Sequence, residues 1–358
     1  MAAAAVLAAL AAQWVVEPIQ PMASARAVHQ AAFVGDGRLL VIGGCSANSC
    51  DALQSSNEFY DIAQRRFRPA PPMRTARVSH ATAALPGGGL LVVGGWTGRG
   101  ATASTEIFDA RAAAFVAGPP MRVPRLDAAV LALDDGRILV AGGASGLNQP
   151  VASAEFYDVA TQRFTPAAGM TLPRTNHASV RLADGRVLLT GGLQAKGRAT
   201  ASAEVYDPRS GKFTAVGAMA SPRYKHAAVA LRDGRVLVIG GSAGDDERQL
   251  LASTDIFDPG TNSFAPGPRL QSPRYKIPSS AVVLADGAVM IAGGAGDVEI
   301  WRPGARHFER ASGSLGAAWQ FGTTTALPSG EVLVLGGYDQ GITPTAKAWI
   351  VRRQGAAP

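Results

Sequence analysis

Short apolar runs, entered through a turn and left through two glycines, recur along the chain. The clearest copy reads GRVLVIGG at residues 234–241. The paired glycines follow one another at intervals of 43 to 53 residues. They stand at Gly43-Gly44, Gly94-Gly95, Gly142-Gly143, Gly191-Gly192, Gly240-Gly241, Gly293-Gly294 and Gly336-Gly337. Seven copies at this period in 358 residues predict one toroidal domain rather than two or three separate domains.

One repeat unit contains four strand-like runs. We expect these strands at residues 174–182, 186–190, 202–207 and 213–216. An Asp-Gly turn joins the first two, because this pair tolerates the positive φ of a tight hairpin. The double glycine ends the second strand, where the backbone must bend or pack closely. Each unit is therefore a four-stranded antiparallel meander, and the predicted fold class is all-β.

The units share further motifs besides the double glycine. These are Glu-x-Tyr-Asp-Pro, an aromatic residue six positions before a Met, and Met-x-x-Pro-Arg. Together they resemble the kelch repeat over about residues 14–353, and we expect a bacterial, exported kelch-repeat protein. The resemblance implies a seven-bladed β-propeller with four-stranded antiparallel blades.

The two ends of the chain predict how the ring closes. Residues 345–351 match the third strand of a blade, with no fourth strand after them. Trp14–Val16 precede Pro21-Met22 and match a fourth strand with no third before it. We therefore expect the N-terminal strand to complete the last blade.

These assignments place a single propeller at residues 13–353 and a tail at 354–358. Residues 1–12 are apolar and too short to span a bilayer, so they are either a signal-peptide core or an alanine-rich tail. Cys45 and Cys50 lie in one loop and form either a small disulfide, as an oxidising compartment favours, or two thiols. We expect export to the periplasm or medium, with a cytoplasmic location as the alternative.

Charge excludes one class of partner. The net charge is +7, yet there is no Lys/Arg block and no ladder of alternating aromatic and basic residues. Binders of RNA and single strands use such ladders, so we do not expect nucleic acid as a partner. The basic residues are better explained as a solvated surface.

A column of arginines begins the first strands, seventeen or nineteen residues before each double glycine. It reads Arg26, Arg77, Arg125, Arg174, Arg223, Arg274 and, in blade 7, Trp319. Acids recur in the third strands at Glu58, Glu106, Glu155, Glu204, Asp255 and Glu299, where we align Lys347 in blade 7. The arginines could form an anion-binding funnel, and in some kelch adaptors arginines at this place contact acidic peptides. Because blade 7 lacks both charges, we favour buried Arg-carboxylate pairs.

Histidines stand three residues after several of these arginines. They are His29, His80, His177 and His226. Because they are spread one to a blade, we interpret them as core residues rather than metal ligands.

Departures from the repeat cluster in blades 5 to 7. Only in these blades does the arginine, or Trp319 in its place, stand beside aromatic and cationic residues. In blade 6, the loop between the double glycine and the acid also shrinks to four residues, 295–298. Loops that join strand 2 to strand 3 and one blade to the next share a face, which we call the loop face, and function is expected there. The predicted ligand-binding residues are Arg223, Tyr224, Lys225, Arg274, Tyr275, Lys276, Trp319 and Gln320.

Two functions fit these residues. The first is a binding module whose loop face holds a protein, a glycan or a small anionic ligand on aromatic and cationic side chains. The alternative is an enzyme of isomerase, epimerase or oxidase type, with Tyr, Lys and Arg as acid-base groups at the channel mouth. The sequence has no nucleophile elbow, phosphate loop or metal-spaced His/Cys cluster. We expect no cofactor, no metal, no membrane span and a monomer.

The resemblance covers both functions. Kelch propellers include peptide-binding adaptors, copper-radical oxidases and a sialic acid epimerase. The oxidases need a cysteine near a tyrosine, two histidines and an extra domain, so this chain fits them poorly.

Overall fold

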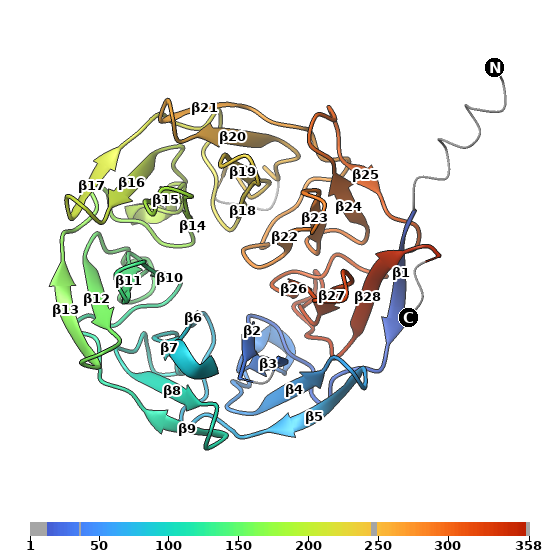
Figure 1. Ribbon diagram of the computed structural model, residues 1–358, viewed down its shortest axis with the longest axis horizontal. Coiled ribbons are helices and arrows are strands. Elements are labelled where there is room, and N and C mark those ends of the chain that lie inside the picture. Colours follow the sequence, from blue (N-terminus) through green and yellow to red (C-terminus); the bar gives the residue numbers. More distant parts are fainter. Residues whose placement is uncertain (1–12, 36, 245–248, 356–358) are drawn as a thin grey trace.

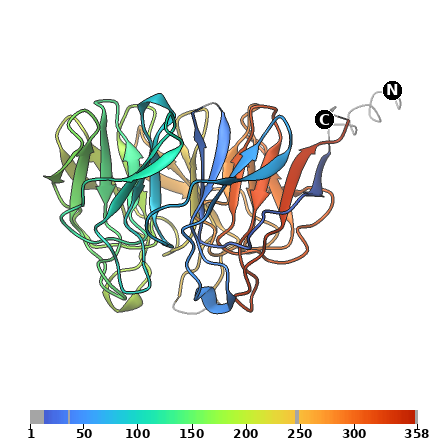
Figure 2. The same cartoon turned by 90° about the horizontal axis from the view of Figure 1, so that it is seen from below.

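Seven four-stranded antiparallel sheets stand in a ring around a central channel (Figure 1). The computed structural model describes residues 13–35, 37–244 and 249–355. Figure 2 shows that the loops on one face of the ring extend farther than the turns on the other. The all-β, seven-bladed propeller predicted from the repeat is therefore confirmed.

The strands follow the chain in blade order. Blades 1 to 3 are β2 (Gln30–Val34), β3 (Arg38–Ile42), β4 (Asn57–Asp61), β5 (Arg66–Ala70); β6 (Ala81–Ala84), β7 (Leu90–Val93), β8 (Thr105–Asp109), β9 (Ala114–Ala117); and β10 (Ala129–Ala132), β11 (Arg137–Ala141), β12 (Ala154–Asp158), β13 (Arg163–Ala167). Blades 4 and 5 are β14 (Ala178–Arg181), β15 (Val187–Thr190), β16 (Ala203–Asp207), β17 (Lys212–Ala215); and β18 (Ala227–Ala230), β19 (Val236–Ile239), β20 (Thr254–Asp258), β21 (Ser263–Pro266). Blades 6 and 7 are β22 (Ala281–Val283), β23 (Val289–Ala292), β24 (Val298–Trp301), β25 (Glu309–Arg310); and β26 (Thr323–Ala326), β27 (Val332–Leu335), β28 (Ala348–Arg353), β1 (Trp14–Ile19). Short 3-10 turns are η2 (Asn48–Cys50), η3 (Pro86–Gly88) and η4 (Ala195–Gly197).

The core lies between neighbouring blades. Every residue of β19 is buried, as are all residues of β7, β15, β23 and β27, because both sheet faces are covered. Leu139 of β11 and Leu189 of β15, for example, belong to one apolar cluster that joins blades 3 and 4. A continuous apolar run of four or five residues is what such a strand requires.

Each double glycine holds two blades together. Gly191 and Gly192 both have positive φ, at 61° and 98°, and a Cβ on Gly191 would collide with the carbonyl oxygen of Arg223 in the next blade. The Gly192 amide donates to that oxygen at 2.8 Å. The same bond joins all neighbouring blades: Gly44 to Arg77, Gly95 to Arg125, Gly143 to Arg174, Gly192 to Arg223, Gly241 to Arg274, Gly294 to Trp319 and Gly337 to Arg26. Only glycine permits this conformation together with this close approach.

One strand boundary differs from the sequence prediction. The first strand of blade 4 begins at Ala178 instead of Arg174. Asn176 has φ of 53°, so the chain turns before it enters the sheet. The other three strands of this blade lie within one residue of their predicted limits.

The N-terminal strand closes the ring, as the ends of the sequence predicted. β1 pairs with β28 from Trp14 opposite Arg353 to Ile19 opposite Ala348, and the two lie side by side in Figure 1. Arg352 donates to both carboxylate oxygens of Glu17, at 2.8 and 2.9 Å.

The structure also decides between the two states of the cysteines. Cys45 and Cys50 are joined by a disulfide, with Cα atoms 5.0 Å apart.

None of the described helices is long and apolar enough to cross a membrane. The suggested signal-peptide core or tail at 1–12 lies outside the described residues.

Deletion of residues 1–21 tests the closing strand. The variant loses β1, so β28 becomes an unpaired edge, and we expect a clearly lower melting temperature or aggregation. Deletion of residues 1–12 keeps all of β1 and is the matched control. Equal melting temperatures for the longer deletion and the full chain would show that β1 does not lock the ring.

Candidate functional site

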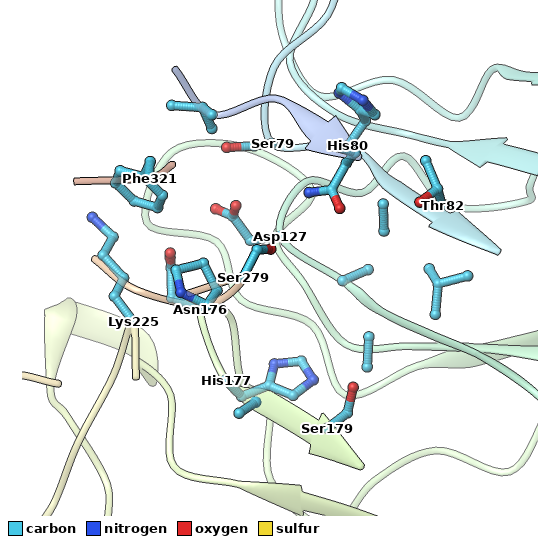
Figure 3. Close-up of a pocket in the computed structure, with 18 of the residues that line it drawn as sticks. Ser79, His80, Thr82, Asp127, Asn176, His177, Ser179, Lys225, Ser279 and Phe321 are labelled. Atoms are coloured by element: carbon cyan, nitrogen blue, oxygen red, sulfur yellow. The ribbon is translucent and has the colours of Figure 1, made fainter. Parts of the chain in front are cut away.

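A pocket of about 240 Å³ occupies the loop-face mouth of the central channel (Figure 3). We call it the channel pocket. Its walls come from the segments that lead into the first strands of the blades. Its polar side chains include Gln30, Ser79, Thr82, Asp127, Asn176, Ser179, Lys225 and Ser279.

A ring of residues in left-handed conformation shapes this mouth. The residue two positions after each arginine, or after Trp319, has φ between 50° and 57°. We call these residues the mouth ring: Val28, Ser79, Asp127, Asn176, Lys225, Lys276 and Phe321. All except Lys276 line the channel pocket.

Backbone hydrogen bonds between blades fix the mouth ring. The Asp127 amide donates to the Ser79 carbonyl at 2.9 Å, and the Lys225 amide donates to the Asn176 carbonyl at 2.9 Å. Phe321 is bonded to both neighbouring blades: its amide donates to the Lys276 carbonyl, and its own carbonyl accepts from the Val28 amide. The side chains are therefore presented at defined positions rather than on free loops.

Asp127 is the acidic member of the ring. Burial raises its pKa, while the nearby Lys225 ammonium and hydrogen bonds from the Ser79 and Asn176 side chains oppose the rise. Figure 3 shows the Asp127 and Lys225 side chains at the same mouth, with the Phe321 ring near the lysine. The pocket thus combines hydrogen-bond donors, acceptors and one aromatic face.

The two lysines of the ring lie among aromatic side chains. Lys225 Nζ is 5.7 Å from the ring centroids of Tyr224 and Tyr275 and 5.4 Å from that of Phe321. Lys276 Nζ is 5.3 Å from the centroids of Tyr275 and Tyr338. Cation–π attraction at these distances helps to hold both ammonium groups in place.

The structure brings together half of the predicted site residues. Tyr224 and Tyr275 lie beside Lys225 and Lys276, and the Tyr275 hydroxyl donates to that of Tyr224 at 2.8 Å. Both tyrosines are buried, at 5% and 4% exposure, so they support the lysines from below. Substituting them with alanine would therefore disturb the core as well as the mouth.

The other predicted residues lie elsewhere. Arg223 and Arg274 are fully buried within their blades, and Gln320 is buried. Trp319 packs against Trp349, with ring centroids 6.1 Å apart and ring planes tilted by 39°. That these residues bind a ligand stays a prediction.

Sequence reasoning missed three residues of the mouth. Ser79, Asp127 and Asn176 occupy the same repeat position as Lys225 in blades 2 to 4. Comparison of that position across all blades, rather than of the aromatic blades alone, would have singled them out. Its left-handed conformation was hard to recognise, because residues such as Val28 and Phe321 rarely adopt it.

The arginine column is structural in its contacts. Arg174 donates through Nη1 to the carbonyls of Gly191 and Ser202, and through Nη2 to Glu204 Oε1 at 2.8 Å. Glu204 also accepts two backbone amides from the segment that crosses into the blade, at Thr171 and Leu172. Such pairs recur between Arg26 and Glu58, Arg77 and Glu106, Arg125 and Glu155, Arg223 and Asp255, and Arg274 and Glu299. Their burial leaves no guanidinium exposed as an anion funnel.

Blade 7 requires a correction to the sequence alignment. In blade 4, Leu189 of β15 faces Glu204, and the equivalent Val334 of β27 faces Trp349. Trp349, not Lys347, therefore stands in the place of the acid. Variable loop length hid this register, which strand pairing decides. A tryptophan pair replaces the ion pair of the other blades.

The repeat histidines are held neutral. Burial lowers the pKa of His29, His80 and His177 to about 3 and that of His226 well below 6.5. His29 Nε2 lies 3.0 Å from the Thr323 hydroxyl. Among the described residues, no three His, Cys, Asp or Glu side chains are grouped to hold a metal ion.

Comparison with known proteins agrees with this architecture. The kelch motif matches residues 125–171 and 223–271, which cover blades 3 and 5. No curated protein matches the chain. The chain is a seven-bladed β-propeller that carries the kelch motif in two of its blades. Propellers of this kind commonly act as protein-binding modules.

Removal of one partner of a buried pair tests the arginine column. Arg174→Ala and Glu204→Ala should each lower the free energy of unfolding by about 3 to 5 kcal/mol, because the remaining charge is buried without compensation. Urea denaturation measures the loss. The control is Arg235→Ala, whose pair with Asp233 is half exposed and should contribute about 1 kcal/mol or less. Equal losses at buried and exposed sites would contradict the structural role.

Acid should destabilise the protein through its histidines. The unfolded chain takes up protons near pH 6.5, whereas folded His29, His80 and His177 stay neutral down to about pH 3. Stability is therefore fully present above about pH 6.5 and is lost as the pH falls, by up to about 1.4 kcal/mol per pH unit for each histidine.

His177→Ala isolates one of these groups. Blade 3 already carries Ala128 at this position. The slope of unfolding free energy against pH should fall by up to about 1.4 kcal/mol per unit between about pH 6 and 4. An unchanged slope would show that folding does not lower the pKa of His177.

Proposed function

We propose that this kelch propeller is a binding module that recognises an anionic or glycan-like ligand at the channel pocket on its loop face. The mouth ring carries the proposal. A side chain other than glycine in left-handed conformation costs on the order of 1 kcal/mol, and here seven consecutive blades accept that cost. Glycine would remove the strain, and its absence from all seven positions supports a role for these side chains in recognition.

The chemistry of the pocket supports this ligand class. Ser79, Asp127 and Asn176 offer donors and acceptors that suit hydroxyl groups, and Phe321 offers an aromatic face. Lys225, held by cation–π contacts, suits an anionic group. A concave site with a few placed polar groups is typical of small-ligand recognition.

One observation favours the enzyme alternative. Asp127 is a carboxyl group with a raised pKa inside a pocket, as a general acid requires. A binding module and an enzyme would share this pocket, and turnover of a bound ligand would separate them.

The disulfide supports export to the periplasm or medium. Such bonds persist in oxidising compartments and are rare in the cytosol.

Titration of neutral and acidic oligosaccharides by calorimetry tests the binding site. We expect binding that Lys225→Met or Asp127→Asn weakens at least about tenfold, equivalent to 1.4 kcal/mol. The lysine effect should decrease with added salt if the ligand is anionic. These changes leave the buried core intact, so melting temperatures should stay close to that of the parent.

The control is Lys212→Met, which removes an exposed lysine of β17 outside the pocket. It should bind like the parent. Binding that Lys225→Met and Asp127→Asn leave unchanged would place the ligand elsewhere. If none of the neutral or acidic oligosaccharides binds, the proposed ligand class is wrong.

A further inference from the structure

A second pocket, of about 350 Å³, opens in blade 7 beside the closing strand. We call it the blade 7 rim pocket. Its walls are the end of β1, the start of β28 and the crossing segment 314–316. It shares no lining residue with the channel pocket, so it is a separate site.

The missing acid of blade 7 explains this opening. In blades 1 to 4 and 6, the carboxylate accepts two backbone amides of the crossing segment and draws that segment against the blade, as Glu204 does with Thr171 and Leu172. Trp349 stands at this position in blade 7 and cannot accept them. There the segment turns at Gly316, with φ of 85°, and the Gly316 amide binds the Ser314 hydroxyl instead.

The pocket combines an apolar floor with one cation. Pro18, Ile19 and Pro21 supply accessible hydrophobic surface, above the buried Leu315 and Trp349. Lys347 is exposed at the edge, with Nζ 5.5 Å from the centroid of Trp319. Lys347 makes no ion pair among the residues that the structure describes.

We propose that the blade 7 rim pocket binds a small carboxylate with a hydrophobic tail. The tail packs on Pro18, Ile19 and Pro21, and the carboxylate reaches the Lys347 ammonium. The ligand thus returns a negative charge to the one blade whose own acid is absent. Charge complementarity selects this class over neutral hydrophobic molecules, because Lys347 is the charged residue among those that line the pocket.

Octanoate and 1-octanol are the probes, since they share a chain and differ in charge. Trp349 and Trp319 adjoin the pocket, so tryptophan fluorescence reports binding to the full-length protein. We expect octanoate to bind at least about tenfold more tightly than 1-octanol. Lys347→Gln should abolish that preference without lowering the melting temperature, because the lysine is exposed.

Two controls locate the probe. Lys196→Gln removes another exposed loop-face lysine, and Lys225→Met changes the channel pocket. Both should bind octanoate like the parent, which keeps this result independent of the channel site. Absence of octanoate binding, equal affinity for the two probes, or loss of binding in Lys225→Met but not in Lys347→Gln would overturn the proposal.

Discussion

The buried arginine at the head of blades 1 to 6 is the contact on which the ring depends. Its guanidinium binds the acid and two carbonyls of its own blade, as Arg174 does with Glu204, Gly191 and Ser202. Its backbone carbonyl accepts the double-glycine amide of the preceding blade. One residue therefore orders a blade internally and also fixes its distance from the neighbour. Because the same residue does both, the loops can differ in length, so that the repeat period ranges from 43 to 53 residues without disturbing the ring.

Positions outside this scaffold are available for recognition. The mouth ring follows the arginines by two residues, and its backbone bonds hold whatever side chain each blade presents. It therefore carries an acid in blade 3, an amide in blade 4 and lysines in blades 5 and 6. In blade 7, Trp319 and Trp349 replace the buried arginine and acid of the other blades. The blade remains in the ring because Gly294 and Gly337 still make their bonds to its neighbours on both sides.

The repeat made the fold predictable, since seven copies of one pattern leave few arrangements, and the phase of the ends predicted the pairing of β1 with β28. The Arg-acid pairs followed from their joint absence in blade 7. The direction in which individual side chains point was harder to predict from the sequence. Tyr224 and Tyr275 differ from their repeat equivalents, which suggested exposed recognition residues, yet they pack under the lysines because the chain turns at the next residue. Lys347 was misaligned with the acids because loop length cannot reveal strand register, which depends on pairing across the sheet.

Ring closure by the first strand also sets an order of events in folding. Glu17 and Arg352, which meet across β1 and β28, are 335 residues apart in the chain. The paired arginine and acid of each of blades 1 to 6 are separated by only 25 to 32 residues. Each of those blades can form from a contiguous segment as it leaves the ribosome, but β1 must wait for the last strand to be synthesised. During that interval β1 lacks its partner, and the nascent ring stays open. At high local concentration, β1 of one copy could pair with β28 of another and yield a strand-exchanged dimer from the contacts that normally close the monomeric ring.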